Sequence, residues 1–126
     1  MAFYKWVLLA GVIVIAIASI AIVFGGITPT ANAAKYDSFA KCLNENGVKM
    51  YGAFWCSHCN AQKQLFGDSW KYMNYIECSN SDGNQNKLCS EAGITGYPTW
   101  ELPNGQRMQG ELTLDQLSKL SNCTLG

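Results

Sequence analysis

The sequence predicts a small α/β domain that is preceded by one long apolar segment. Three observations support this prediction. Helix-like and strand-like patterns alternate through residues 36–126, a Cys-x-x-Cys pair at positions 56–59 follows one of the strand-like patterns, and the longest apolar run lies near the amino terminus. The predicted order of elements is helix, strand, helix, strand, helix, strand, strand, helix.

The composition divides the chain into two unlike parts. Of the first 34 residues 25 are apolar, against 36 of the 92 that follow, and Lys5 is the one charged residue of the first part. The whole chain carries nine basic and nine acidic residues, so its net charge is zero. A neutral chain has no strong positive field, and we therefore expect no nucleic-acid partner.

Residues 1–27 are predicted to be a membrane anchor. Residues 6–27 contain no charge, and a helix of this length extends about 33 Å, enough to cross a bilayer. A cleaved signal peptide is the alternative, because Ala31-Asn32-Ala33 has the small-x-small form of a cleavage site. Lys5 precedes the apolar run, which predicts that the amino end is inside and the rest of the chain outside the cytoplasm.

Residues 28–35 read as a short linker without a helical period, and residues 36–126 follow as the folded domain. Whether the apolar segment is an anchor or a cleaved signal peptide, we expect this domain to be exported to a periplasmic, extracellular or lumenal compartment. Disulfides persist in such compartments, and all six cysteines lie in the domain. A chain of about 90 residues has a marginal core, so crosslinks would help to stabilise it.

The first half of the domain contains two predicted helices and two predicted strands. One helix is expected to begin after Ser38 and to end at Asn46. Residues 48–55 form a strand that is apolar on both faces, as expected of a central strand covered on each side. A helix over residues 56–67 and a strand over residues 74–78 follow.

The second half of the domain is predicted to hold a short helix, a hairpin and a last helix. Asn-Gly in the middle of the hairpin supplies the positive-φ turn, and a threonine caps the last helix, whose leucines recur every third residue. The expected elements are a loop over residues 79–84, a helix over 85–92, strands over 99–102 and 106–111, and a helix that Thr113 caps and that carries Leu114, Leu117 and Leu120.

The sequence Cys56-Ser57-His58-Cys59 has the context of a redox pair, because it follows a buried strand and begins a helix. Cys56 lies at the helix start, where free backbone amides and the positive end of the helix stabilise a thiolate. Cys59, one turn further, is the expected resolving thiol. A protonated His58 would favour the Cys56 thiolate and make the disulfide more oxidising, unless it is an exposed histidine without an electrostatic role.

Other uses of these cysteines are less well supported. A structural bridge rarely follows an aromatic residue such as Trp55 at the start of a helix. Zinc sites usually combine two closely spaced pairs, whereas the later cysteines stand apart and the single histidine lies inside the motif, so we expect no metal. Covalent haem requires a histidine directly after the second cysteine, and that position is Asn60.

Tyr97-Pro98 precedes the predicted hairpin and is a candidate for a cis peptide bond. The backbone at such a bend can offer hydrogen bonds to a passing peptide. We therefore expect a substrate peptide along Tyr97-Pro98. Trp55 and Trp100 are candidate apolar contacts for it, and ordinary core or rim aromatics are an equally good interpretation of both.

Several motifs together resemble the thioredoxin superfamily over nearly all of residues 36–123. They are Trp55-Cys56-Ser57-His58-Cys59, Tyr97-Pro98-Thr99, and Gly110 followed by a last helix. A closer resemblance is to the thioredoxin-like domain that is fused to, or partners, bacterial and plant homologues of vitamin K epoxide reductase. The stretches that carry it are residues 50–59, residues 62–67, Glu77-Cys78 with Cys89, and residues 96–100.

The resemblance implies a thioredoxin-like fold, in which helices flank a central mixed sheet. It implies that Cys56 is the exposed nucleophile, that Cys59 is its partner and that Pro98 is a cis-proline facing them. It further implies a cycle in which the pair oxidises exported proteins and is reoxidised by a quinone-reducing membrane enzyme. No multi-helix quinone-binding domain is present in the sequence, so we expect a vitamin K epoxide reductase-like partner to act in trans.

Two departures from cytosolic thioredoxin bear on the direction of the reaction. Ser57-His58 replaces the Gly-Pro between the cysteines, which favours an oxidant or an isomerase. Met50 stands where thioredoxin has a buried acid, so no group that deprotonates Cys59 is expected.

The other four cysteines are expected to form two structural disulfides. With Cys56 and Cys59 assigned to each other, three pairings remain, of which we favour Cys78 with Cys89 and Cys42 with Cys123. The second of these would tie the first helix of the domain to the last. The alternative for Cys78 and Cys89, which flank a Ser/Asn/Gly loop, is a second redox pair that relays electrons to or from the first.

The function predicted from the sequence is that of a membrane-anchored extracytoplasmic thiol:disulfide oxidoreductase without a cofactor. Its substrates would be cysteine-containing exported proteins, whose thiols it oxidises or whose disulfides it isomerises. Two alternatives remain: a disulfide reductase that receives electrons from the membrane, and a non-catalytic module that uses the same fold to bind peptides.

Overall fold

The structure of the protein is a computed structural model, and it describes residues 35–126. The predicted anchor, residues 1–27, and residues 28–34 of the predicted linker lie outside the described residues. Between Lys35 and Gly126, no helix has the length and apolar character needed to cross a bilayer.

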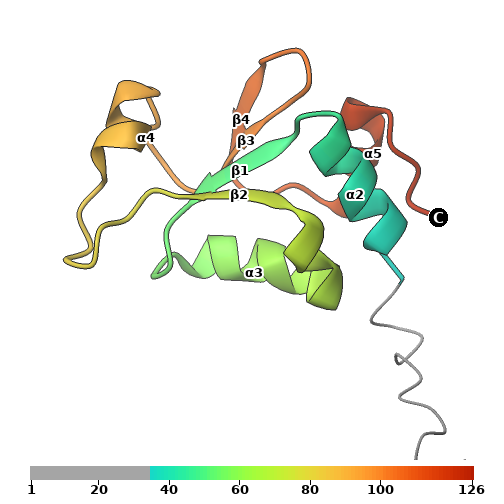
Figure 1. Cartoon of the computed structure of the whole chain (residues 1–126), viewed down its shortest axis with the longest axis horizontal. Coiled ribbons are helices and arrows are strands. Elements are labelled where there is room, and N and C mark those ends of the chain that lie inside the picture. Colours follow the sequence, from blue (N-terminus) through green and yellow to red (C-terminus); the bar gives the residue numbers. More distant parts are fainter. Residues whose placement is uncertain (1–34) are drawn as a thin grey trace, which may run out of the picture.

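Helices and strands alternate along the described residues in the predicted order. The elements are α2 (Asp37–Glu45), β1 (Lys49–Gly52), α3 (Ser57–Phe66), the 3-10 helix η1 (Gly67–Tyr72), β2 (Asn74–Glu77), α4 (Lys87–Glu91), β3 (Thr99–Glu101), β4 (Arg107–Gln109) and α5 (Leu114–Ser121). The strands form one sheet in the order β2-β1-β3-β4 (Figure 1). β1 is parallel to β2, whereas β3 is antiparallel to both β1 and β4. A mixed sheet flanked by helices confirms the α/β part of the predicted fold class and fits a thioredoxin-like fold.

The two faces of the sheet are covered by different elements. Successive side chains of a strand point to opposite faces. Met50 accordingly packs with Phe66 of α3 and Leu117 of α5, whereas its neighbour Tyr51 packs with Ile94 on the other face. Figure 1 shows α4 at the opposite end of the molecule from α2 and α5. α3, which carries the cysteine pair, thus rests on the larger of the two apolar clusters.

Several predicted elements are longer than the observed ones, including the strand predicted over residues 106–111, and local hydrogen bonds give the reason for two of them. The strand predicted over residues 48–55 ends at Gly52, because the Cys56 amide donates to the Ala53 carbonyl at 3.0 Å and turns the chain into α3. The helix predicted over residues 85–92 is shorter, because the Asn86 side chain accepts from the Cys89 amide at 3.0 Å and thereby caps α4.

The two terminal helices also differ from their predictions. α2 starts at Asp37, so Ser38 lies inside the helix and does not cap it. Thr113 does cap α5, through a capping box with Gln116. The expected leucine face is not fully buried, however: Leu117 is buried and Leu120 is exposed. Because a helix turns 100° per residue, positions three apart drift around its surface.

Two disulfides crosslink the domain, and both join the cysteines that the sequence favoured as partners. Cys42 of α2 is bonded to Cys123, which follows α5, across 81 residues of sequence. Cys78 is bonded to Cys89 of α4, and both of these residues are completely buried. Their burial favours the structural interpretation over a second redox pair, since a thiolate must reach a sulfur atom to attack it.

Candidate active site

Cys56 and Cys59 are both free thiols and lie one turn apart at the beginning of α3. Cys56 occupies the N-cap position, where its sulfur accepts a hydrogen bond from the Cys59 amide at 3.2 Å. Such a bond is stronger when the acceptor is charged, so the helix start offers a fitting environment for a Cys56 thiolate. Cys56 is 6% exposed and Cys59 is completely buried. The pair is therefore asymmetric, although Cys56 is nearly buried and not the exposed nucleophile that the resemblance implied.

Cys59 is held as a neutral thiol. Burial, and then its hydrogen bond with Cys56, raise the pKa of Cys59 to about 12. A methyl group on Gly52 would lie 3.0 Å from the Cys59 sulfur and 2.9 Å from the Tyr75 ring. A glycine at this position of β1 therefore lets the buried sulfur and the aromatic ring approach the strand closely.

A phenol on β2 lies beside Cys59 and is hydrogen-bonded to a carboxylate, although the sequence predicted no acid near this thiol. The Tyr75 hydroxyl lies 3.3 Å from the same point next to Gly52 and donates to Glu77 at 2.8 Å. Burial, and then this hydrogen bond, raise the pKa of Tyr75. Sequence reasoning missed the two residues because it looked for an acid only at Met50, on the neighbouring strand.

His58 is paired with a carboxylate that the sequence did not suggest. Its Nδ1 lies 2.5 Å from a carboxylate oxygen of Glu111, in the segment after β4, and both side chains are largely exposed. The structure thus gives His58 an acidic partner across the open end of the site. A carboxylate in a distant segment has no local sequence signal, which is why Glu111 was missed.

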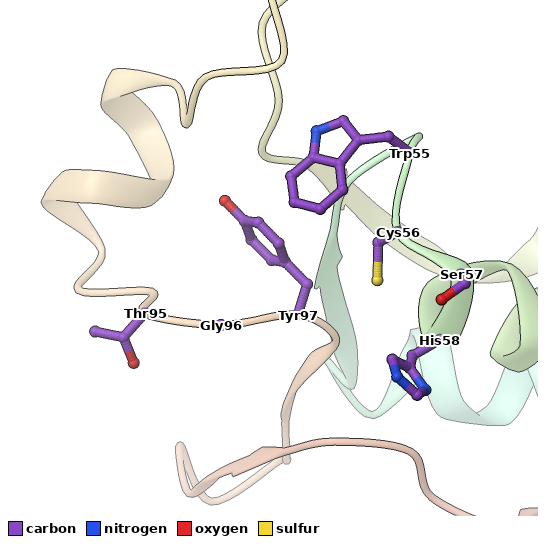
Figure 2. A pocket seen from close by; sticks show the side chains of 7 residues that line it. All are labelled: Trp55, Cys56, Ser57, His58, Thr95, Gly96 and Tyr97. Atoms are coloured by element: carbon purple, nitrogen blue, oxygen red, sulfur yellow. The ribbon is translucent and has the colours of Figure 1, made fainter.

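An open pocket of about 400 Å³ lies in front of Cys56. The residues lining it are Trp55, Cys56, Ser57, His58, Thr95, Gly96 and Tyr97. Figure 2 shows the sulfur of Cys56 pointing toward the space between Tyr97 and His58. The Trp55 and Tyr97 rings meet edge to face with centroids 5.9 Å apart, and Trp55 is 54% exposed. The sulfur, the histidine and two aromatic rings therefore share one accessible cavity.

The segment around Pro98 forms the wall of this pocket opposite α3. The Tyr97–Pro98 peptide bond is cis, and Pro98 is completely buried. The Pro98 carbonyl accepts from the Gly110 amide at 2.8 Å, which fixes the segment against the end of β4. Tyr97 is thus brought to the same pocket as Cys56.

Trp100 does not belong to the pocket, which corrects its prediction as a substrate contact. It is completely buried, and its indole nitrogen donates to Gln62 of α3 at 2.8 Å. Of the two interpretations open for this residue, the core aromatic is the right one. The Gln62 side chain, also completely buried, was not anticipated from the sequence.

Comparison with known proteins finds a similarity to a redox protein. No protein-family model matches the chain. Over 94 residues the chain is 44% identical to the thiol-disulfide oxidoreductase LTO1 of Arabidopsis thaliana. The alignment covers 70% of this chain and 24% of that relative, so the match spans about a quarter of the relative's length. The name of the relative refers to thiol–disulfide exchange, a chemistry that requires an accessible sulfur with a second sulfur close to it.

Proposed function

We propose that the domain is a thiol:disulfide oxidoreductase in which Cys56 and Cys59 exchange a disulfide with the cysteines of other proteins. The observation that carries this proposal is the geometry of the pair. Cys56 faces an open pocket and accepts an amide hydrogen bond at the start of α3, and Cys59 lies buried one turn behind it. The similarity to a thiol-disulfide oxidoreductase supports the same chemistry.

In the oxidising direction the reaction begins with a disulfide between Cys56 and Cys59. A substrate thiolate attacks the Cys56 sulfur; the bond between the two cysteines breaks, and its electron pair remains on Cys59. Cys59 then takes up a proton, as its raised pKa requires at neutral pH. A second substrate thiolate attacks the substrate sulfur of the mixed disulfide, and Cys56 leaves as a thiolate. The substrate has lost two electrons and the pair has gained them.

We infer that the pair oxidises its substrates in preference to reducing them. The hydrogen bond from the Cys59 amide to the Cys56 sulfur supports this direction, because such a bond is stronger when the acceptor is a thiolate and so favours the reduced pair. A cysteine pair whose reduced form is the preferred state passes its disulfide to substrates and thereby oxidises them. An isomerase uses the same residues, with a thiolate on Cys56 at the start of the cycle.

We place the domain on the extracytoplasmic side of a membrane, anchored through residues 6–27. Two disulfides outside the Cys56–Cys59 pair suit an oxidising compartment, and the apolar run after Lys5 suits an anchor. Its substrates would be cysteine-containing exported proteins. A vitamin K epoxide reductase-like membrane enzyme, acting in trans, would reoxidise the pair.

Trapping of mixed disulfides tests this proposal. In the full chain, Cys59→Ala removes the neighbouring thiol that can attack the Cys56 sulfur of the mixed disulfide, so partners without a second reactive thiol should remain covalently bound to Cys56 and be released by a reductant. A Cys56→Ser variant, which lacks the nucleophile, is the control and should trap nothing. If both variants trap nothing in the native membrane, the domain is a peptide-binding module without this activity.

The redox potential of the pair separates the two directions. An oxidant should have a potential well above that of thioredoxin, which is about −270 mV. A value at or below the thioredoxin potential would refute oxidation and support a reductase that receives electrons from the membrane.

A further inference from the structure

The loop that the Cys78–Cys89 disulfide closes holds both aromatic walls of the pocket. The indole nitrogen of Trp55 donates to the Ser79 hydroxyl at 2.9 Å, and the Tyr97 hydroxyl donates to the Gln85 amide oxygen at 2.6 Å. Trp55 precedes α3 and Tyr97 precedes β3. Two walls from distant parts of the chain are thus held by residues that lie six positions apart.

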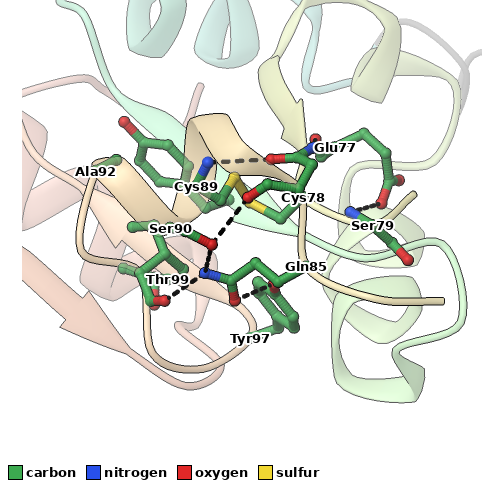
Figure 3. Close-up of a disulfide and its surroundings, with 12 residues drawn as sticks. Glu77, Cys78, Ser79, Gln85, Cys89, Ser90, Ala92, Tyr97 and Thr99 are labelled. Atoms are coloured by element: carbon green, nitrogen blue, oxygen red, sulfur yellow. Dashed lines mark hydrogen bonds between the residues drawn. A yellow bond between two sulfur atoms is a disulfide. The ribbon is translucent and has the colours of Figure 1, made fainter.

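Ser79 and Gln85 belong to one small frame. They pair with each other as an isolated antiparallel bridge, and the Asn86 amide donates to the Cys78 carbonyl at 2.7 Å. The disulfide joins Cys78 to α4 directly beyond this bridge (Figure 3). The positions of the two holding residues are therefore coupled, and a shift of one side of the loop moves the other.

The orientation of each holding group is fixed by further hydrogen bonds. The Ser79 hydroxyl donates to the Asn80 carbonyl at 3.0 Å, which leaves its oxygen to accept from Trp55. The Gln85 amide nitrogen donates to the Ile94 carbonyl at 2.8 Å, which turns the amide oxygen toward Tyr97 (Figure 3). Neither residue lines the pocket. Both act on it through the aromatic ring that they hold.

We propose that Ser79 and Gln85 are positioning residues that determine which peptides the pocket accepts next to the reactive cysteine. The substrates are extended polypeptide segments with an apolar side chain beside their cysteine, which fits between the rings of Trp55 and Tyr97. A ring that lacks its hydrogen bond can leave its place, and ordering it again on binding weakens binding of the peptide. A small dithiol needs only the Cys56 sulfur and is insensitive to the two walls. This inference rests on the proposed oxidoreductase function.

The test compares a peptide with a small dithiol as substrates of the oxidised full chain. The probes are a peptide with two cysteines flanked by leucines and, separately, dithiothreitol. Ser79→Ala and Gln85→Leu should each raise the KM for the peptide about fivefold, the loss of one hydrogen bond worth about 1 kcal/mol, at an unchanged kcat. The rate with dithiothreitol and the redox potential of the pair should not change. Asn84→Ala is the matched control, since this loop residue bonds Asp82 and neither ring.

A double-mutant cycle distinguishes the loss of the Gln85–Tyr97 contact from a general loosening of the loop. Tyr97→Phe removes the other half of the contact with Gln85, so adding Gln85→Leu to Tyr97→Phe should raise the peptide KM no further. Additive effects, or equal losses with peptide and dithiothreitol, would overturn the inference. The inference would also be overturned if Ser79→Ala and Gln85→Leu both oxidised the peptide with the kcat and KM of the unaltered chain. If the unaltered chain oxidises neither probe, the proposed function itself fails, and the inference fails with it.

Discussion

Replacement of Gln62 by leucine should destabilise the domain strongly, because this buried amide satisfies three other buried groups. Its oxygen accepts from the Trp100 indole at 2.8 Å and from the Leu112 amide at 2.8 Å, and its nitrogen donates to the Leu112 carbonyl at 2.9 Å. Leucine fills a similar volume but makes none of these bonds. Each group left without a partner costs about 1 kcal/mol or more. The removal of a buried amide offsets part of that cost, so we expect a net loss of about 3 kcal/mol.

A loss of this size is measurable, since small domains have free energies of unfolding of about 5 to 15 kcal/mol. Urea unfolding of the oxidised protein should show a lower midpoint for Gln62→Leu at an unchanged slope. Gln64→Ala is the matched control: Gln64 lies on the same helix, is exposed, and should change stability by less than about 0.5 kcal/mol. A loss below about 1 kcal/mol for Gln62→Leu would show that the amide does not hold α3 to β3.

Three further predictions concern crosslinking and pH. Replacing Cys42 and Cys123 by serine opens a loop of 81 residues and should cost about 4.5 kcal/mol of unfolding free energy in urea, where a loss below about 1 kcal/mol would contradict the loop-entropy argument. Because burial raises the pKa of Cys59 to about 12, the unfolded thiol loses its proton first, and the reduced protein should lose stability as the pH rises above 9. The disulfide form, measured in parallel, should lose less, because it retains the raised pKa of Tyr75 but has no Cys59 thiol. The hydrogen bond from Lys49 lowers the pKa of Glu101, so stability should fall as the pH drops below about 4.5, and a Glu101→Gln variant with the same acid dependence would count against this.

The position of the cysteine pair could be predicted from the sequence because it depends on adjacent residues alone. A buried strand, a turn and a helix start are encoded by adjacent residues, and Cys56 lies within that stretch. The order of the strands, in contrast, depends on residues that are distant in the sequence. β1 lies between β2 and β3 through pairings with residues about 25 and 50 positions further on, and the apolar pattern of a strand does not name its neighbours.

The two tryptophans show where sequence reasoning ends. Trp55 and Trp100 both stand next to motif residues, and both were open to the same two interpretations. The structure leaves Trp55 on the rim of the pocket and buries Trp100 against Gln62. What separates them is a glutamine on another element, and a helical glutamine carries no signal that it is buried. Contacts of this type can be found only once the elements are assembled.

The disulfide between Cys42 and Cys123 also determines where the two ends of the described chain lie. It brings α2, the first described helix, within 5.9 Å between Cα atoms of the residues that follow α5, the last one. Figure 1 shows the start of α2 and the carboxyl end on one side of the molecule, and the start of α3 on the other. The start of α3, where Cys56 lies, is therefore remote from both ends of the described chain.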